Sequence, residues 1–281
     1  MALTDVTWPS AAGRGATGPL ALSGLVRPMV LRGAAAEWPA VRRWSFDALA
    51  DGVPDQPVTL VVGNRERGTT RLRQGSLRDY LDCLALQAAV DARAPAEDVV
   101  YQLKEFDLLR AHPALRQDLR WQELARPRWS VVSHGMWIGP AGARTGLHRD
   151  LLDNLAVLLL GRKRFFLLPP GRVEALGAVS DKYDRWAVLA RVGAEALAGG
   201  GAAEAIQVVD LAPGDALYLP RGWWHEVVNL TPSVLLGGFF GPVPRVVSLW
   251  AWTGLRQACH LAGWRRGRCC CHADQGDQPA A

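Results

Sequence analysis

Short apolar runs separated by glycine and proline dominate the second half of the chain. Seven such runs follow Trp129, and most of them have no strongly helical segment between them. Runs of this length and spacing are typical of an antiparallel sandwich or barrel. We therefore predict a mainly β fold with strands over SVVSHGMWIG, NLAVLLLG, KRFFLLPP, AIQVVDLAPG, DALYLP, WHEVVNL and SVLLGGFFG.

The first half of the chain mixes strand-like and helical patterns. The runs PMVLRG and PVTLVVGN predict two short strands, with a helix between them that opens at turn residues. Residues 76–92 carry apolar side chains at helical spacing behind Ser76, a residue type that caps helix N-termini. Segment 106–126 predicts one or two short helices broken at Pro113. We expect an α/β region here.

Two further helices are predicted in the second half. Residues 183–198 have the pattern of a helical insertion, and a C-terminal helix follows Pro244. One face of the C-terminal helix is apolar, which favours packing or dimerisation over membrane contact, so we hypothesise a homodimer through this helix. The apolar face consists of Val247, Trp250, Ala251, Ala258 and Leu261.

These patterns divide the chain into five predicted regions. A flexible N-terminus precedes an α/β region packed on the core, and the β core is followed by a helix and a disordered tail. The corresponding ranges are 1–20, 21–128, 129–243, 244–267 and 268–281.

The composition is that of an ordinary globular protein. Of 281 residues, 49% are hydrophobic and 21% are charged, enough to bury a sizeable core. No apolar run approaches the roughly 20 residues that a membrane-spanning helix needs. The first residues show neither the basic nor the apolar segment of a secretory signal. We therefore expect a cytoplasmic protein without membrane contact.

Cysteine usage agrees with a reducing compartment. Cys83 and Cys259 stand alone at apolar positions and are predicted to be buried. The cluster Cys269–Cys271 with His272 has metal-binding residue types, but adjacent cysteines cannot easily all face one ion. We predict an oxidation-prone, disordered tail there, whose role the sequence leaves open.

The net charge of +5 and the pI of about 9.2 raise the question of nucleic-acid binding. The arginines are spread over the chain without a basic helix that interleaves stacking aromatics, which argues against nucleic acid as a partner. Only three of the 32 basic residues are lysines, namely Lys104, Lys163 and Lys182.

A histidine and an aspartate two residues apart precede the most apolar run of the chain. On a strand, His148 and Asp150 face one side while Arg149 faces the other. An imidazole and a carboxylate on one face form two thirds of the 2-His-1-carboxylate triad of non-haem Fe(II) sites. The pair alone carries little weight because it arises easily by chance.

The third ligand is best sought at His225, because the turn before it starts a new strand. His134 lies in another predicted strand and is the one competitor. His260 and His272 fall in the C-terminal helix and the tail. A buried structural histidine is the alternative interpretation of His225.

These residues lie in sequence motifs that resemble those of a known family. The matching stretches are T-x-x-H-x-D from Thr145, Asn154, G-x-K-x-x-x-L-x-P-P at 161–170, PGDALYLP and WWH, with RPMVLRGAAAEWPAVRRWS upstream. Over residues 20–242 the chain resembles the cupin-like JmjC oxygenases that use Fe(II) and 2-oxoglutarate, in the branch of the asparaginyl hydroxylase that acts on hypoxia-inducible factor. The resemblance implies a double-stranded β-helix (cupin or jelly-roll) core.

The resemblance also implies a role for each matching residue. His148, Asp150 and His225 would bind iron; Lys163, helped by Thr145, would bind the distal carboxylate of 2-oxoglutarate; Asn154 would lie beside the metal and the cosubstrate. The charges of Fe(II), one aspartate, 2-oxoglutarate and one lysine sum to zero, which favours a buried ionic site.

The implied activity is that of a dioxygenase. With O2, the enzyme would convert 2-oxoglutarate to succinate and CO2 while hydroxylating a protein or peptide side chain. Two alternatives stay open: a metal-binding cupin with other chemistry, and a degenerate cupin that acts as a binding module. The identity of the substrate, and hydroxylation versus demethylation, also stay open.

One departure from the family concerns the last predicted strand. Members often carry an asparagine there that faces the cosubstrate, whereas this chain has Gly237 and Gly238. We expect these glycines to loosen the surroundings of the cosubstrate. The tryptophans Trp137, Trp223 and Trp224 either line the cavity or belong to the core.

Overall fold

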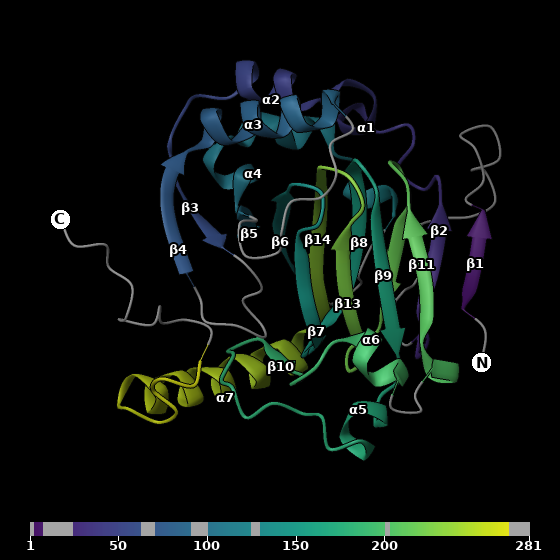
Figure 1. The fold of residues 1–281 in the computed structure, drawn as a ribbon, viewed down its shortest axis with the longest axis vertical. Helices are drawn as coiled ribbons and strands as arrows, with labels where there is room; N and C mark the ends of the chain where they lie inside the picture. The colour runs from purple at the N-terminus through teal and green to yellow at the C-terminus, as the bar shows by residue number, and fades with distance from the viewer. Residues whose placement is uncertain are drawn as a thin grey trace.

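The computed structural model describes residues 3–7, 25–62, 71–90, 101–124, 130–199 and 203–269. Within these residues all strands named below belong to two sheets, and helices lie at both ends of the strands (Figure 1). The strands are β1 (Thr4–Thr7), β2 (Met29–Arg32), β3 (Pro57–Val62), β4 (Arg71–Ser76), β5 (Tyr101–Phe106), β6 (Ser130–Gly139), β7 (Arg144–Asp150), β8 (Asp153–Leu160), β9 (Lys163–Leu168), β10 (Ala187–Leu189), β11 (Gln207–Leu211), β12 (Ala216–Leu219), β13 (Trp224–Asn229) and β14 (Ser233–Pro242). The helices are α1 (Pro39–Arg43), α2 (Phe46–Gly52), α3 (Leu77–Ala89), α4 (Leu108–Ala111), α5 (Arg172–Ala175), α6 (Ala194–Leu197) and α7 (Val243–Leu261).

The two sheets are built from strands that alternate between them along the chain. The larger sheet has the order β1-β2-β12-β8-β14-β6-β5-β3-β4 and the smaller the order β10-β7-β13-β9-β11. Thus β7, β9, β11 and β13 lie in the smaller sheet, while β6, β8, β12 and β14 lie in the larger. This alternation is expected for a double-stranded β-helix. The predicted mainly β, cupin-like fold with an α/β N-terminal region and a C-terminal helix is confirmed.

The strongly apolar run of β8 is explained by burial on both of its faces. Leu155, Val157 and Leu159 pack against the N-terminal helices, while Ala156 and Leu158 point into the space between the sheets. A strand covered on both sides has no polar face, so its sequence shows no alternation. Burial of each of these leucines contributes about 1.5–3 kcal/mol to folding.

Three apolar clusters hold the layers together. The largest lies between the larger sheet and the N-terminal helices, with Trp38 and Leu84 fully packed inside it. The second fills part of the space between the sheets and includes Phe165. The third covers the outer face of the smaller sheet, where Trp224 and Leu168 pack against α5 and α6.

The N-terminal helices begin where the sequence predicts. Ser76 Oγ accepts a hydrogen bond from the amide of Asp79 at 3.2 Å, which confirms Ser76 as the N-cap of α3. The region predicted to hold short helices contains α4 and then a 3₁₀ segment that starts at Pro113. Figure 1 shows α1, α2 and α3 beyond one end of the strands and α7 across the other end.

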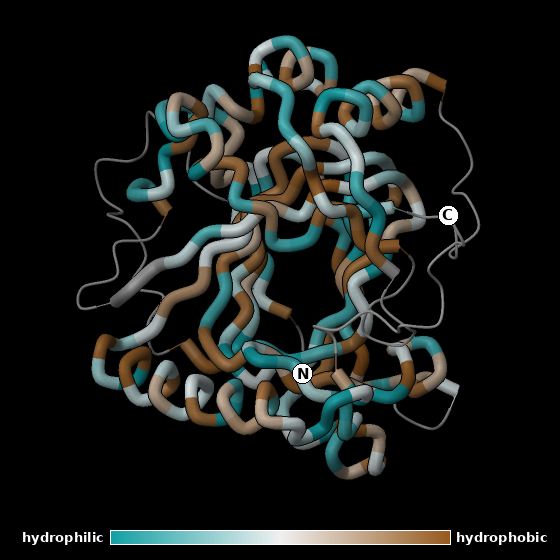
Figure 2. The backbone as a smooth tube through the Cα atoms, turned by 90° about the vertical axis from the view of Figure 1, so that its left-hand side faces the viewer, coloured by the Kyte–Doolittle hydropathy of each residue, from teal (hydrophilic) through white to brown (hydrophobic). Residues whose placement is uncertain are grey.

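The C-terminal helix α7 is amphipathic, but most of its large apolar residues are exposed. Val246, Thr253 and His260 are the buried positions, whereas Val247 and Leu261 are 59% and 66% exposed. Figure 2 shows hydrophobic segments concentrated in the strands and an alternation of hydrophobic and hydrophilic residues along the helices at both ends. None of the helices within the described residues has the length and apolar character that crossing a bilayer requires.

The predicted helix over 183–198 is wrong for most of this segment, and only its end is helical. This segment forms the short edge strand β10, which pairs antiparallel with β7, and then α6, which begins after Gly193. Local spacing favoured a helix, but hydrogen bonds to the edge of the smaller sheet stabilise an extended backbone instead.

The predicted burial of Cys83 and Cys259 is also wrong, because both are exposed. Cys83 lies beside, not on, the buried face of α3 that Leu77, Leu81 and Leu84 form. In the tail, Cys269 is buried and its backbone pairs with Tyr183. Cys270, Cys271 and His272 lie outside the described residues.

Candidate metal centre

Strands β7 and β13 place two histidines opposite each other. His148 and His225 are register partners in this antiparallel pair. One step further the register shifts, so that Thr145 pairs with Val227 and β7 contains one extra residue. This β-bulge turns both Thr145 and His148 toward the interior although they are three residues apart.

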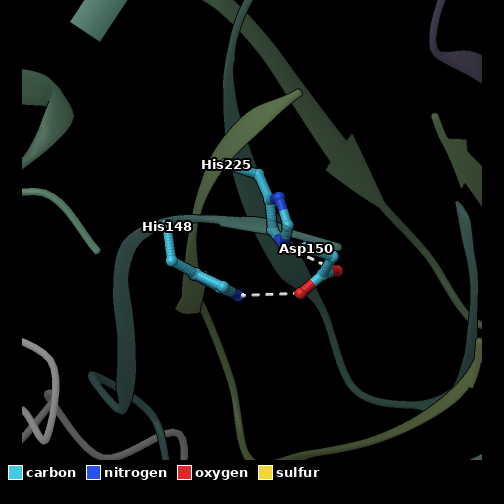
Figure 3. A group of neighbouring side chains, drawn as sticks. All are labelled: His148, Asp150 and His225. Carbon is cyan, nitrogen blue, oxygen red and sulfur yellow. Dashed lines mark ion pairs between the residues drawn. The ribbon is translucent and has the colours of Figure 1, made fainter. Parts of the chain in front are cut away.

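Three potential ligand atoms converge at this point. The Nε2 atoms of His148 and His225 lie 3.8 and 3.6 Å from the two carboxylate oxygens of Asp150 (Figure 3). One ligand atom from each residue lies within 4.8 Å of the others. Two ligands about 2.1 Å from one ion, at angles of about 90–120°, lie roughly 3.0–3.6 Å apart. The spacing is therefore close to that of a single metal site.

Backbone carbonyls orient both imidazoles for metal binding. Nδ1 of His148 lies 2.7 Å from the carbonyl oxygen of Gly146, and Nδ1 of His225 lies 3.2 Å from that of Trp223. A carbonyl only accepts, so each Nδ1 carries a hydrogen, and each Nε2 is the ring atom that faces the metal position. Burial and the nearby His148 lower the pKa of His225 to about 4, which keeps its ring neutral near pH 7.

The aspartate is held by a neighbouring strand. Asn154, on β8 in the other sheet, donates from Nδ2 to Oδ2 of Asp150 at 3.2 Å. Arg149, between the two predicted ligands, points to the outer face and forms an ion pair with Glu174 at 3.2 Å. The alternation predicted for His148, Arg149 and Asp150 is thus present. Two imidazoles and one carboxylate suit a divalent cation.

His134, the competing histidine, lies in the same cavity but outside this group. It comes from β6, and its ring meets Trp121 edge-on at 4.8 Å. Burial lowers its pKa. Among the residues that the structure describes, the one group of ligand types spaced for a metal is His148, Asp150 and His225.

Lys163 is a buried cation in the wall of this cavity. Its side chain is 4% exposed, and Nζ donates to Oδ1 of Asn229 at 2.6 Å. Burial, with repulsion from Lys104, lowers the pKa of Lys163 to about 7. No carboxylate in the described part of the chain forms an ion pair with it. A bound carboxylate would supply the missing counter-charge.

The two faces of β9 differ in how their charged side chains are paired. Arg164 forms a bidentate ion pair with Asp210 on the outer face, at 2.7 and 2.8 Å. Lys163 is therefore a buried charge, unlike the more exposed Arg164.

All six predicted site residues line one cavity of about 670 Å³. They are Thr145, His148, Asp150, Asn154, Lys163 and His225. This volume lies in the range of small-molecule sites. Sequence reasoning missed other residues of the wall, among them Lys104, Phe165, Trp186 and Trp250. Only Phe165 had a signal in the sequence, since it lies two residues beyond Lys163 on the same strand.

The three tryptophans have different places. Trp137 lines the cavity, whereas Trp223 and Trp224 are buried in the core. Trp223 Nε1 donates to the carbonyl of Val26 at 3.0 Å, and Trp224 Nε1 donates to Glu174 at 3.1 Å.

The glycines of β14 do not leave free space, which corrects the expectation of a loosened site. A Cβ atom at Gly237 would lie 2.5 Å from Cζ3 of Trp137, and one at Gly238 would lie 2.2 Å from Cζ2 of Trp121. Indole rings therefore fill the volume next to these two positions.

Comparison with known proteins places the chain in a family. It belongs to the cupin-like domain family, whose model matches residues 22–246. Among its relatives are Jumonji C domain-containing protein 5 of Drosophila melanogaster, 26% identical, and Lysine-specific demethylase JMJ21 of Arabidopsis thaliana, 28% identical. Each alignment covers 74% of this chain, and 53% and 22% of the respective relative.

A third relative is Bifunctional peptidase and (3S)-lysyl hydroxylase JMJD7 of Homo sapiens. It is 27% identical over 51% of this chain and 48% of its own length. The chain spans about half the length, or less, of these relatives. The resemblance to JmjC proteins is confirmed, while the branch of the asparaginyl hydroxylase stays a prediction.

Proposed function

We propose that this protein is an Fe(II)- and 2-oxoglutarate-dependent dioxygenase that hydroxylates a protein or peptide side chain. The observation that carries the proposal is the presence, in one cavity, of a two-histidine, one-carboxylate group and a buried lysine. The first suits Fe(II), and the second suits the distal carboxylate of a dicarboxylic cosubstrate.

Each residue has a separate task in this proposal. His148, Asp150 and His225 hold the metal, and Asn154 fixes the orientation of the Asp150 carboxylate. Thr145 and Lys163 bind the distal carboxylate of 2-oxoglutarate. When bound, Fe(II) and 2-oxoglutarate supply O2 activation, with decarboxylation to succinate and CO2 coupled to oxidation of a C–H bond. The apolar walls orient the reactants and exclude water.

A macromolecular substrate is favoured by the outer part of the cavity. Its lining includes Trp186 and Trp250, which are 38% and 56% exposed. Exposed indoles beside a cavity offer apolar contact to a segment that presents one side chain to the metal. Two relatives are named for lysine demethylation and lysyl hydroxylation. Both reactions oxidise a C–H bond, and we propose hydroxylation as the outcome.

Labelled oxygen tests the proposed reaction. The protein is incubated with Fe(II), 2-oxoglutarate, ¹⁸O2 and a peptide mixture, and both succinate and peptides are analysed by mass spectrometry. We expect one ¹⁸O atom in succinate and peptides heavier by one oxygen atom, with neither product in His148→Ala. Loss of a methyl group would show demethylation instead. Oxidised peptide formed without 2-oxoglutarate would contradict the proposal and favour a cupin with other chemistry.

A further inference from the structure

The lysines of this chain are unevenly placed. Only three of its 32 basic residues are lysines, yet Lys104 and Lys163 both line the cavity described above. The third, Lys182, is partly exposed and does not line it. An ammonium is more compact than a guanidinium and approaches a single carboxylate from a confined space more easily. The use of lysine at position 104 therefore suggests a role for its ammonium group inside the cavity.

A local irregularity of β5 shapes the wall that carries Lys104. The register between β5 and β6 shifts between Leu103 and Phe106, so β5 contains an extra residue. Glu105 has a φ of 55°, in the left-handed region that side chains other than glycine rarely adopt. Such bulges occur beside active sites, where they redirect a side chain. Lys104 and Glu105 form this bulge and line the cavity.

Strand β5 lies close in space to Lys163. A Cβ atom on Gly139 would lie 3.2 Å from both Cβ of Gln102 and Nδ2 of Asn229, so these two side chains flank the same glycine. Asn229 in turn accepts the hydrogen bond from Lys163. Lys104 is two residues beyond Gln102 on β5, a step of about 7 Å along a strand. Its long, flexible side chain spans such a step.

The electrostatics agree with this placement. The charge of Lys104 acts on Lys163 and, together with burial, lowers the pKa of Lys163. Two ammonium groups that repel each other across one cavity both gain from a single anion between them.

We propose that Lys104 is a second cationic binding residue for the distal carboxylate of 2-oxoglutarate, acting together with Lys163. The inference rests on the proposed function, since it concerns the same cosubstrate. It adds a residue that the family resemblance did not indicate. The carboxylate then lies between two ammonium groups that come from opposite sheets of the sandwich, β5 in the larger and β9 in the smaller.

The test measures binding without turnover. The protein, loaded with Fe(II) in the absence of O2, is titrated calorimetrically with 2-oxoglutarate and with 2-oxopentanoate, which keeps the chelating end but lacks the distal carboxylate. Lys104→Met is compared with the matched control Lys182→Met. We expect Lys104→Met to weaken 2-oxoglutarate binding about tenfold and 2-oxopentanoate binding not at all, whereas Lys182→Met changes neither.

Lys104→Arg separates charge from packing, because it keeps the positive charge. It should retain most of the affinity for 2-oxoglutarate, and thermal unfolding of each variant confirms that it is folded.

Two results would overturn the inference: unchanged binding of 2-oxoglutarate to Lys104→Met, or an equal loss for both ligands, which would move Lys104 away from the distal carboxylate. Failure of the proposed function looks different, because the unaltered protein would then bind Fe(II) but not 2-oxoglutarate.

Discussion

The Asp150 carboxylate depends on a side chain from the opposite sheet. Asn154 donates to it at 3.2 Å, and both side chains are largely buried. A ligand held by such a hydrogen bond needs little reorganisation when the metal arrives. The orientation of the Asp150 carboxylate therefore depends on its hydrogen bond from Asn154.

Replacing Asn154 tests this pairing. We expect Asn154→Ala to weaken Fe(II) binding about tenfold, because loss of a residue that orients a ligand typically lowers metal affinity by 10- to 100-fold. The measurement is an anaerobic metal titration, with Arg149→Gln as the control on the outer face of β7. Equal affinity of Asn154→Ala and the unaltered protein would show that Asp150 is oriented by other groups.

The lowered pKa of Lys163 gives the site a pH dependence. Unfolded, the lysine holds its proton up to about pH 10.5, whereas in the folded protein it releases the proton near pH 7. Between these values the unfolded state binds more protons, so the stability of the ligand-free protein rises with pH. Binding of a carboxylate needs the protonated lysine, so cosubstrate affinity changes in the opposite direction.

We therefore expect 2-oxoglutarate to bind more weakly as the pH rises through 7. The dissociation constant should increase about fivefold from pH 7 to pH 8, since the protonated fraction of Lys163 falls by that factor. Anaerobic calorimetry across this range measures it. Lys163→Met, which cannot titrate, should bind weakly without this slope. An equal slope in the variant would assign the pH dependence to another group.

At the residue scale, the predicted ligands and the lysine of the cavity could be found from the sequence, but other residues of the cavity wall could not. His148, Asp150, His225 and Lys163 could be predicted because their residue types and spacing carry chemistry. Lys104 could not, since its position depends on a bulge that leaves no mark in the sequence.

At the element scale, indole rings from neighbouring segments occupy the space beside β14 that the side chains of Gly237 and Gly238 would otherwise fill. Gly237 and Gly238 meet the rings of Trp137 and Trp121, which leave no room for a Cβ atom. A glycine that normally weakens a strand is here required by close packing.

Substitution of Gly238 measures this packing. We expect Gly238→Ala to destabilise the protein by about 1–3 kcal/mol, the usual cost of overpacking, as measured by urea unfolding. Adding Trp121→Leu should recover part of the loss by making room. Gly75→Ala, on strand β4, is the matched control, because its added Cβ would meet Cδ1 of Leu60 at an ordinary contact distance of 3.5 Å. Unchanged stability of Gly238→Ala would mean that the indole moves away without cost.

Strands were easier to predict from the sequence than the connections between them. The seven apolar runs all became strands because Gly and Pro marked their ends. The edge strand β10 was mistaken for a helix, since its pairing with β7 is a tertiary contact that local spacing does not encode.

At the scale of the whole molecule, the exposed face of α7 supports the predicted homodimer. Its apolar members Val247 and Leu261 are 59% and 66% exposed. Large apolar side chains grouped on one face indicate an interaction surface. We propose that a second copy of the chain covers this face.

Charge placed on α7 tests the dimer. We expect the double variant Val247→Glu/Leu261→Glu to run as a monomer in light scattering, where the unaltered protein runs as a dimer, because two buried like charges oppose association. Ser248→Glu, at an exposed polar position of the same helix, is the control. A monomeric unaltered protein would contradict the proposal directly.

The overall architecture followed from the alternation of apolar runs and from the family resemblance together. Neither reveals the arrangement of the cavity mouth, where Trp186 and Trp250 come from segments far apart in the chain. Their proximity results from the path of α7 and the loop before β10, which only the folded structure defines.

The central claim is that one cavity binds both Fe(II) and 2-oxoglutarate. The most direct measurement adds Fe(II) and then 2-oxoglutarate to the protein without O2 and records the visible charge-transfer absorption. We predict a band that is absent from His148→Ala and strongly weakened in Lys163→Ala. Metal binding without any band on addition of 2-oxoglutarate would contradict the account.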